Sequence, residues 1–123
     1  MLGDQELIAF IATTDGDRAK AFYTDVLGLR LVSDDPFAVV FDAHGTMLRV
    51  QKAPHHRPLP HTALGWQVAS IADVVAKLAA KGVAFSRFDG MDQDAAGIWT
   101  APGGAKIAWF KDPDGNVLSL TEL

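Results

Sequence analysis

The sequence contains no cysteine among its 123 residues. Disulfides, thiolate nucleophiles and cysteine-ligated metal sites are therefore excluded, and we expect a reducing, cytoplasmic location. Long hydrophobic runs are also missing, since the longest apolar stretch, residues 7–12, is far below the roughly 20 residues of a membrane helix. The N-terminal residues carry acids and no basic residue, so we expect no secretory signal.

An excess of positive charge is missing as well, because the formal net charge is −4. Nucleic acid and anionic membranes attract basic surfaces, so we expect neither as a partner. Hydrophobic residues make up 49% of the chain and charged residues 21%, which is typical of a globular protein. The length predicts one domain over residues 1–123, with enough chain for a core and too little for two domains.

The first part of the chain predicts a strand, a helix and three further strands. Asp15 is the expected helix N-cap and Gly28 the expected helix end. Between them, four apolar residues share the spacing of one helix face: Ala19, Phe22, Tyr23 and Val26. Apolar runs predict the strands at residues 7–13, 29–33, 37–41 and 46–51.

The same order then starts again after residues 53–60, which hold three of the six prolines and predict a linker. Ser70 is the second expected helix cap and Gly82 the second helix end. The helix stripe between them consists of Ile71, Val74, Val75 and Leu78. The expected strands are residues 62–69, 83–85, 105–111 and 117–121.

The two halves match at fixed offsets, which indicates duplicated modules. An offset of 70 relates Asp42, Gly45, Leu48 and Val50 to Asp112, Gly115, Leu118 and Leu120. We therefore predict an α+β fold of two βαβββ modules, residues 1–52 and 61–123. Together they would form a cupped, mostly antiparallel sheet with the helices on the outside.

Two stretches carry a resemblance to a known family. They are DGDRAKAFYTDVLGL at residues 15–29 and WFKDPDGNVLSLTE at residues 109–122. With these stretches in a two-module chain, the sequence resembles the vicinal oxygen chelate superfamily, which is also called the glyoxalase, bleomycin-resistance protein and dioxygenase superfamily. The resemblance implies the cupped fold and a small organic ligand held in the cup.

The resemblance also implies where a metal would bind, because the first and last strands of each module carry the family's ligands. A divalent ion there acts as a Lewis acid on two substrate oxygens. Carried onto this chain, the four positions are Ile8, Arg49, Ala63 and Ser119. They offer one neutral hydroxyl and one permanent cation, so we expect no metal and no other cofactor. The alternative is a displaced metal site built from nearby residues: Glu6, Gln51, His61, Gln67 and Glu122.

Strand alternation places Met47, Arg49 and Gln51 on the face opposite to Leu48 and Val50. We expect the first set to point into the cup. A guanidinium in an apolar cup favours a carboxylate or phosphate, whereas the competing interpretation is an arginine paired with a surface acid. The expected ligand contacts are Ile8, Phe10, Met47, Arg49, Gln51, Ala63, Gln67, Trp99 and Ser119.

Other polar and aromatic residues allow two interpretations each. Trp99 lies in a glycine-rich stretch and either stacks on a flat ligand or clamps the loop. We interpret His55, His56 and His61 as solvated loop residues rather than metal ligands. The acidic segment around Asp94 is a solvated loop, with attraction of a cationic ligand as the alternative.

Three functional hypotheses follow. The first is a metal-independent protein that binds a small molecule; the second is a lyase, isomerase or dioxygenase of the same superfamily with a displaced metal site or an Arg49 electrophile. The third is an accessory protein whose cup has lost its function. No catalytic residue is identified. We also expect a homodimer, because chains of this type usually pair and pairing covers open sheet edges.

Overall fold

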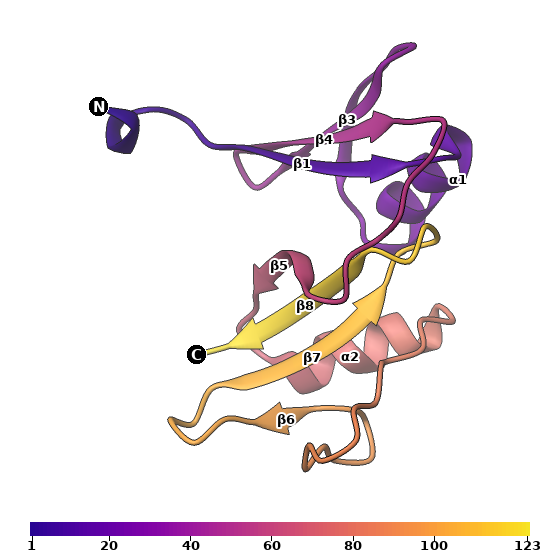
Figure 1. The fold of residues 1–123 in the computed structure, drawn as a ribbon. Coiled ribbons are helices and arrows are strands. Elements are labelled where there is room, and N and C mark those ends of the chain that lie inside the picture. The colour runs from indigo at the N-terminus through magenta and orange to yellow at the C-terminus, as the bar shows by residue number, and fades with distance from the viewer. The chain divides into compact units, whose positions relative to one another are not determined.

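We describe residues 1–123 from a computed structural model. The chain consists of two compact units, Met1–Arg57 and Pro58–Leu123, and their boundary falls inside the predicted linker. Each unit contains one four-stranded sheet and one main helix (Figure 1). The α+β class and the repeated strand–helix–three-strand order are confirmed, and a single domain over residues 1–123 stays a prediction. No helix has the length and apolar character that crossing a bilayer requires.

The sheet of the first unit has the order β1-β4-β3-β2. A short 3-10 turn, η1 (Leu2–Asp4), precedes it. The parallel pairing of β1 with β4 makes this sheet mixed, while the other two pairings are antiparallel. All four predicted strands are present, with each end shifted by at most two residues: β1 (Ile8–Thr13), β2 (Arg30–Asp34), β3 (Ala38–Ala43) and β4 (Thr46–Lys52).

The first helix begins as predicted and then changes type. The Asp15 carboxylate accepts a hydrogen bond from the amide of Arg18 at 3.1 Å and caps α1 (Gly16–Ala21). The chain then continues as a π-helix, η2 (Phe22–Val26), so the predicted helix is present but its second half has a wider turn that the sequence pattern did not indicate. The wider turn accompanies the packing of Tyr23, which is fully buried with its ring centre 5.7 Å from that of Phe41.

The sheet of the second unit has the order β5-β8-β7-β6 and again combines one parallel and two antiparallel pairings. Its strands are β5 (Thr62–Gln67), β6 (Trp99–Thr100), β7 (Lys106–Lys111) and β8 (Val117–Glu122). Ser70 caps α2 (Ile71–Ala80) through its hydroxyl, as predicted. The buried residues of α2 are Ile71, Val75 and Leu78, which confirms the predicted stripe.

The predicted strand at residues 83–85 is wrong. This segment is not part of the ladder, and β6 forms the edge of the sheet instead. The apolar residues of the segment serve side-chain packing, since the rings of Phe85 and Phe110 lie 5.5 Å apart. The apolar character of this short run therefore reflects the packing of Phe85 and not strand pairing.

The repeat holds with one correction in the hairpins. In the first unit, Ala43 opposes Thr46 across a turn whose two residues both have positive φ, His44 and Gly45. In the second unit, Lys111 opposes Val117 and a longer loop, residues 112–116, joins them. Residues 43–46 separate Asp42 from its partner Met47, whereas residues 112–116 separate Lys111 from its partner Val117. Because the second hairpin has this one extra residue, Lys111 rather than Asp112 occupies the place of Asp42.

The displaced Asp112 organises the longer loop. One carboxylate oxygen accepts hydrogen bonds from the amides of Asp114 and Asn116, each at 2.9 Å. The other accepts one from the side-chain amide of Asn116 at 2.8 Å. Both Asp112 and Asn116 are buried, so these bonds satisfy groups that water does not reach.

Removal of this carboxylate should destabilise the protein. Asp112→Ala leaves three donors without their acceptor, and we expect a loss of about 1–3 kcal/mol in the free energy of unfolding. Urea denaturation followed by circular dichroism measures it. Asp92→Ala, the same change at an exposed position, is the control. Equal midpoints for the two variants would show that the loop does not depend on Asp112.

Candidate functional site

One face of the first sheet is open. Along β1 and β4 buried residues alternate with exposed ones, and Leu48 and Val50 are buried as predicted. On the other face Ile8, Phe10 and Met47 are 45%, 53% and 40% exposed. We call this face the open face of the first sheet, formed by Ile8, Phe10, Met47, Arg49 and Gln51.

Arg49 occupies the centre of this face. It lies on β4, an inner strand, where it is opposite Phe10 of β1 and Val40 of β3. Ile8 is opposite Met47, two residues before Phe10 and Arg49 on the same two strands. The structure thus brings together five of the nine expected ligand contacts, in an arrangement with one half-buried cation among large apolar side chains.

Arg49 forms no ion pair, although acidic residues lie in the same unit. Asp35 is one acid that Arg49 influences, because the charge of Arg49 contributes to a lowered pKa of that carboxyl. The main cause of the lowered pKa is the hydrogen bond from the amide of Phe37 at 2.7 Å, followed by the bond from Ala38. The Asp35 carboxylate therefore serves mainly its own turn.

Asp34 is engaged by two lysines. Its carboxylate lies 2.6 Å from Nζ of Lys52 and 3.4 Å from Nζ of Lys20. The hydrogen bond from Lys52 is the largest cause of the lowered pKa of Asp34. These contacts join α1, β2 and β4, and they use a carboxylate that would otherwise be available to other cations.

The corresponding face of the second sheet has a different character. Gly65 of β5 is opposite Ser119 of β8, which is opposite Trp109 of β7. A Cβ atom at Gly65 would lie 2.6 Å from Oγ of Ser119, so any larger residue there would require the Ser119 side chain to move. Ser119 is buried and Gln67 lies at the exposed end of β5. Ala63 falls in a bulge, because its neighbours pair with consecutive residues of β8.

Trp99 belongs to an aromatic cluster that the sequence analysis missed. Its ring centre lies 6.2 Å from that of Trp109, and Phe88 meets Trp109 edge-on at 5.4 Å. Trp109 could have been placed from the sequence, because it precedes the buried Phe110 in the predicted strand and so points to the opposite face. Phe88 lies in a loop without periodicity and gave no such signal.

The residues at the family's metal positions do not fit a divalent ion. Ile8 and Ala63 carry no donor, Arg49 is a cation, and Ser119 adds one hydroxyl. Within either unit no three His, Asp or Glu side chains gather at distances that suit a metal ion. Glu122 has another role, because its carboxylate accepts a hydrogen bond from the amide of Ile71 at 3.0 Å.

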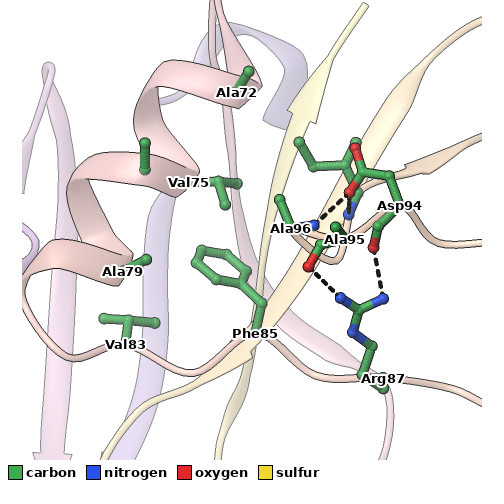
Figure 2. A pocket seen from close by; sticks show the side chains of 11 residues that line it. Ala72, Val75, Ala79, Val83, Phe85, Arg87, Asp94, Ala95 and Ala96 are labelled. Atoms are coloured by element: carbon green, nitrogen blue, oxygen red, sulfur yellow. Dashed lines mark hydrogen bonds between the residues drawn. The ribbon is translucent and has the colours of Figure 1, made fainter.

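A hollow of about 390 Å³ lies on the helix side of the second unit, between α2 and residues 94–98 (Figure 2). Arg87 donates hydrogen bonds to the carbonyl oxygens of Asp94 and Ala95. The Asp94 carboxylate accepts bonds from the amides of Ala96 and Ile98, both at 2.9 Å. Asp94 is exposed, as expected for a solvated loop, and its carboxylate also holds the loop together.

Comparison with known proteins places these observations in a family. The model of the Glyoxalase/Bleomycin resistance protein/Dioxygenase superfamily matches residues 7–120. No curated protein sequence matches significantly.

Solved structures of the same fold match nearly the whole chain. A superfamily member from Sphaerobacter thermophilus DSM 20745 is 25% identical with a TM-score of 0.75, and the match covers 97% of both chains. Lactoylglutathione lyase from Agrobacterium tumefaciens is 21% identical with a TM-score of 0.74, covering 97% of this chain and 93% of the other. TnmS3, an antibiotic binding protein from Streptomyces sp. CB03234, is 23% identical with a TM-score of 0.71, covering 97% and 95%.

The ion pairs of Asp34 predict a pH-dependent contribution to stability. The pKa of Asp34 is lower in the folded chain than its ordinary value of 3.8. Its contribution is therefore present above that value and is lost as the pH falls through the folded pKa. We expect Asp34→Asn to be less stable than the parent at about pH 6, with the difference shrinking towards about pH 2.5. Urea denaturation across this range measures it, with Asp92→Asn as the control; a difference that stays constant with pH would contradict the assignment.

Proposed function

Because the chain belongs to the Glyoxalase/Bleomycin resistance protein/Dioxygenase superfamily, we propose that it binds a small organic molecule bearing a carboxylate or phosphate, and does so without a divalent metal. The observation that carries the proposal is Arg49, a half-buried guanidinium without an ion pair in the middle of the open face of the first sheet.

The surroundings of Arg49 favour an anion with an apolar body. Partial burial raises the cost of an unpaired charge, and a carboxylate or phosphate offsets it through two parallel hydrogen bonds. Phe10 and Met47 flank the guanidinium with exposed apolar surface that a ligand would cover. The remaining expected contacts, Ala63, Gln67, Trp99 and Ser119, belong to the second unit and are part of the proposal.

Binding is favoured over catalysis by the side chains on the open face. Apart from Arg49 they are Ile8, Phe10, Met47 and Gln51, and none of these is an acid or base at neutral pH. A purely binding role has a counterpart in the same fold, since TnmS3 is an antibiotic binding protein. The alternative, a lyase, isomerase or dioxygenase with a displaced metal, would need Glu122 or His61, and the Glu122 carboxylate already bonds to the first residue of α2.

A titration with simple probes tests the role of Arg49. We expect benzoate and phenyl phosphate, added to isotope-labelled protein, to shift the amide signals of β1 and β4 far more than benzamide does. Arg49→Met should weaken binding of both anions by about 1.5–3 kcal/mol, the scale of a hydrogen bond to a charged group. Arg18→Met, the same change on the exposed side of α1, should leave the affinity unchanged. Unchanged affinity in Arg49→Met would contradict an anion-binding arginine.

The same titration tests whether anion binding requires a divalent metal. After treatment with a chelator the protein should bind both anions as before, because no step of the proposed recognition uses an ion. Elemental analysis that finds one equivalent of zinc, nickel, manganese or iron per chain, lost in His61→Ala or Glu122→Gln, would contradict metal independence and favour the enzymatic alternative.

We also propose a homodimer and a cytoplasmic location, the latter resting on the cysteine-free sequence. β2 is an edge strand with all five residues exposed, including the apolar Leu31 and Val32. Phe37, just before β3, is 76% exposed. An edge of this kind gains by pairing with a second chain.

Light scattering at micromolar concentration should give twice the 13.2 kDa mass of one chain. Val32→Lys should shift the population towards monomer, because it places a charge on the apolar edge. Lys106→Met, a change in a strand of the second unit, is the control. A monomeric parent protein would contradict the proposal.

A further inference from the structure

We propose that the second unit holds a separate binding site for a small organic anion with an apolar body, centred on Lys111. A hollow of about 350 Å³ lies there, within the range of about 300–1,000 Å³ that small-molecule pockets occupy. Its walls come from the linker residues Pro58 and Leu59, from Ser86 and Phe88, and from Lys111 at the end of β7. All of these belong to one unit, and none of them is on the open face of the first sheet.

The wall on the Phe88 side is fixed by hydrogen bonds. The amide of Ser86 donates to the carbonyl of Trp109 at 2.8 Å, and the amide of Phe88 donates to Oε1 of Gln93 at 2.8 Å. The side-chain amide of Gln93 in turn donates to the carbonyl of Ser86 at 2.9 Å. The ring of Phe88 also rests edge-on against Trp109. This side of the hollow is therefore formed before any ligand arrives, which lowers the ordering cost of binding.

The opposite wall depends on a close approach of the linker to the β7–β8 loop. Gly115 has a φ of +86°, and a Cβ atom there would lie 3.1 Å from Cγ of Pro58. Glycine thus permits both the turn and the contact with the proline. The proline rings at positions 58 and 60 restrict the linker further, because each fixes its own φ.

The lining favours an anion attached to an apolar group. Leu59 is 61% exposed and Phe88 39% exposed, so large apolar side chains stand open to solvent at the hollow. Lys111 is the one charged residue of the lining, and it forms no ion pair. The hollow beneath α2 differs in this respect, since Arg87 and Asp94 there already bond to the backbone.

A matched set of probes tests the site: 3-phenylpropionate, its neutral amide and the cationic 3-phenylpropylamine. Titrated into isotope-labelled protein, the acid should shift the amide signals of Ser86, Phe88, Lys111 and Gly115, and the amide and the amine should bind more weakly. Lys111→Met should lower the affinity of the acid about tenfold or more, since it removes a charged hydrogen-bond donor. Lys111→Arg should retain most of the affinity.

Lys106→Met is the matched control, because Lys106 lies on the same strand and does not line the hollow. The spectrum of each variant away from the hollow shows whether it is folded. The site is independent of Arg49, so the shifts at Ser86 and Phe88 should persist in Arg49→Met whether or not the first proposal holds. Absence of these shifts, equal binding of the acid and its amide, or an unchanged affinity in Lys111→Met would overturn the inference.

Discussion

The parallel pairing of the first and last strands of each unit is the constraint on which the rest of the structure depends. A parallel neighbour cannot be reached by a short hairpin, so the chain must cross over before it returns. In both units the helix lies in that crossover and packs against the strands that follow it, α1 against β3 and β4 and α2 against β7 and β8. In the first sheet one face is thereby buried under the helix and the other is left open, as alternation along β4 shows.

The same scaffold presents different chemistry in its two copies. At corresponding places on the inner strands the first unit has Arg49 opposite Phe10, and the second has Ser119 opposite Gly65. The first face is therefore apolar with a central cation. The second has a small polar centre with tryptophans beside it, and the absence of a side chain at Gly65 leaves space for the Ser119 hydroxyl. Duplication kept the backbone pairing and left the outward-facing positions free to diverge, since those side chains do not form the core.

Much of the fold could be predicted from the sequence where a single local signal decides the structure. The caps at Asp15 and Ser70 and the alternation at Leu48 and Val50 each follow from a single physical preference, and all four are found. The errors occur where two signals compete. Residues 83–85 have the apolar character of a strand, yet Phe85 packs on Phe110 and it is β6 that pairs with β7.

The features of the sites that escaped prediction depend on contacts between distant residues. The edge-on packing of Phe88 on Trp109 joins a loop to a strand, and no periodic pattern encodes it. The wide turn at η2 is another case, because the α-type stripe of apolar residues is unchanged while the hydrogen bond from Leu27 reaches back five residues to Phe22. The position of Arg49, in contrast, follows from alternation alone and was placed correctly on the open face.

The distribution of carboxylates explains why Arg49 and Lys111 have no ion pair in a chain with a net charge of −4. Asp34 is shared by two lysines, Asp35 accepts from two backbone amides, and Asp112 holds the β7–β8 loop. Each of these acids lies close in sequence to a turn or a strand end and satisfies donors there. A hydrogen bond to a backbone amide in a fixed turn competes well with an ion pair on a mobile side chain, because the turn has already lost its conformational entropy. Arg49 and Lys111 are therefore left without an ion pair, and this is the basis on which we propose an anion as the ligand at each of them.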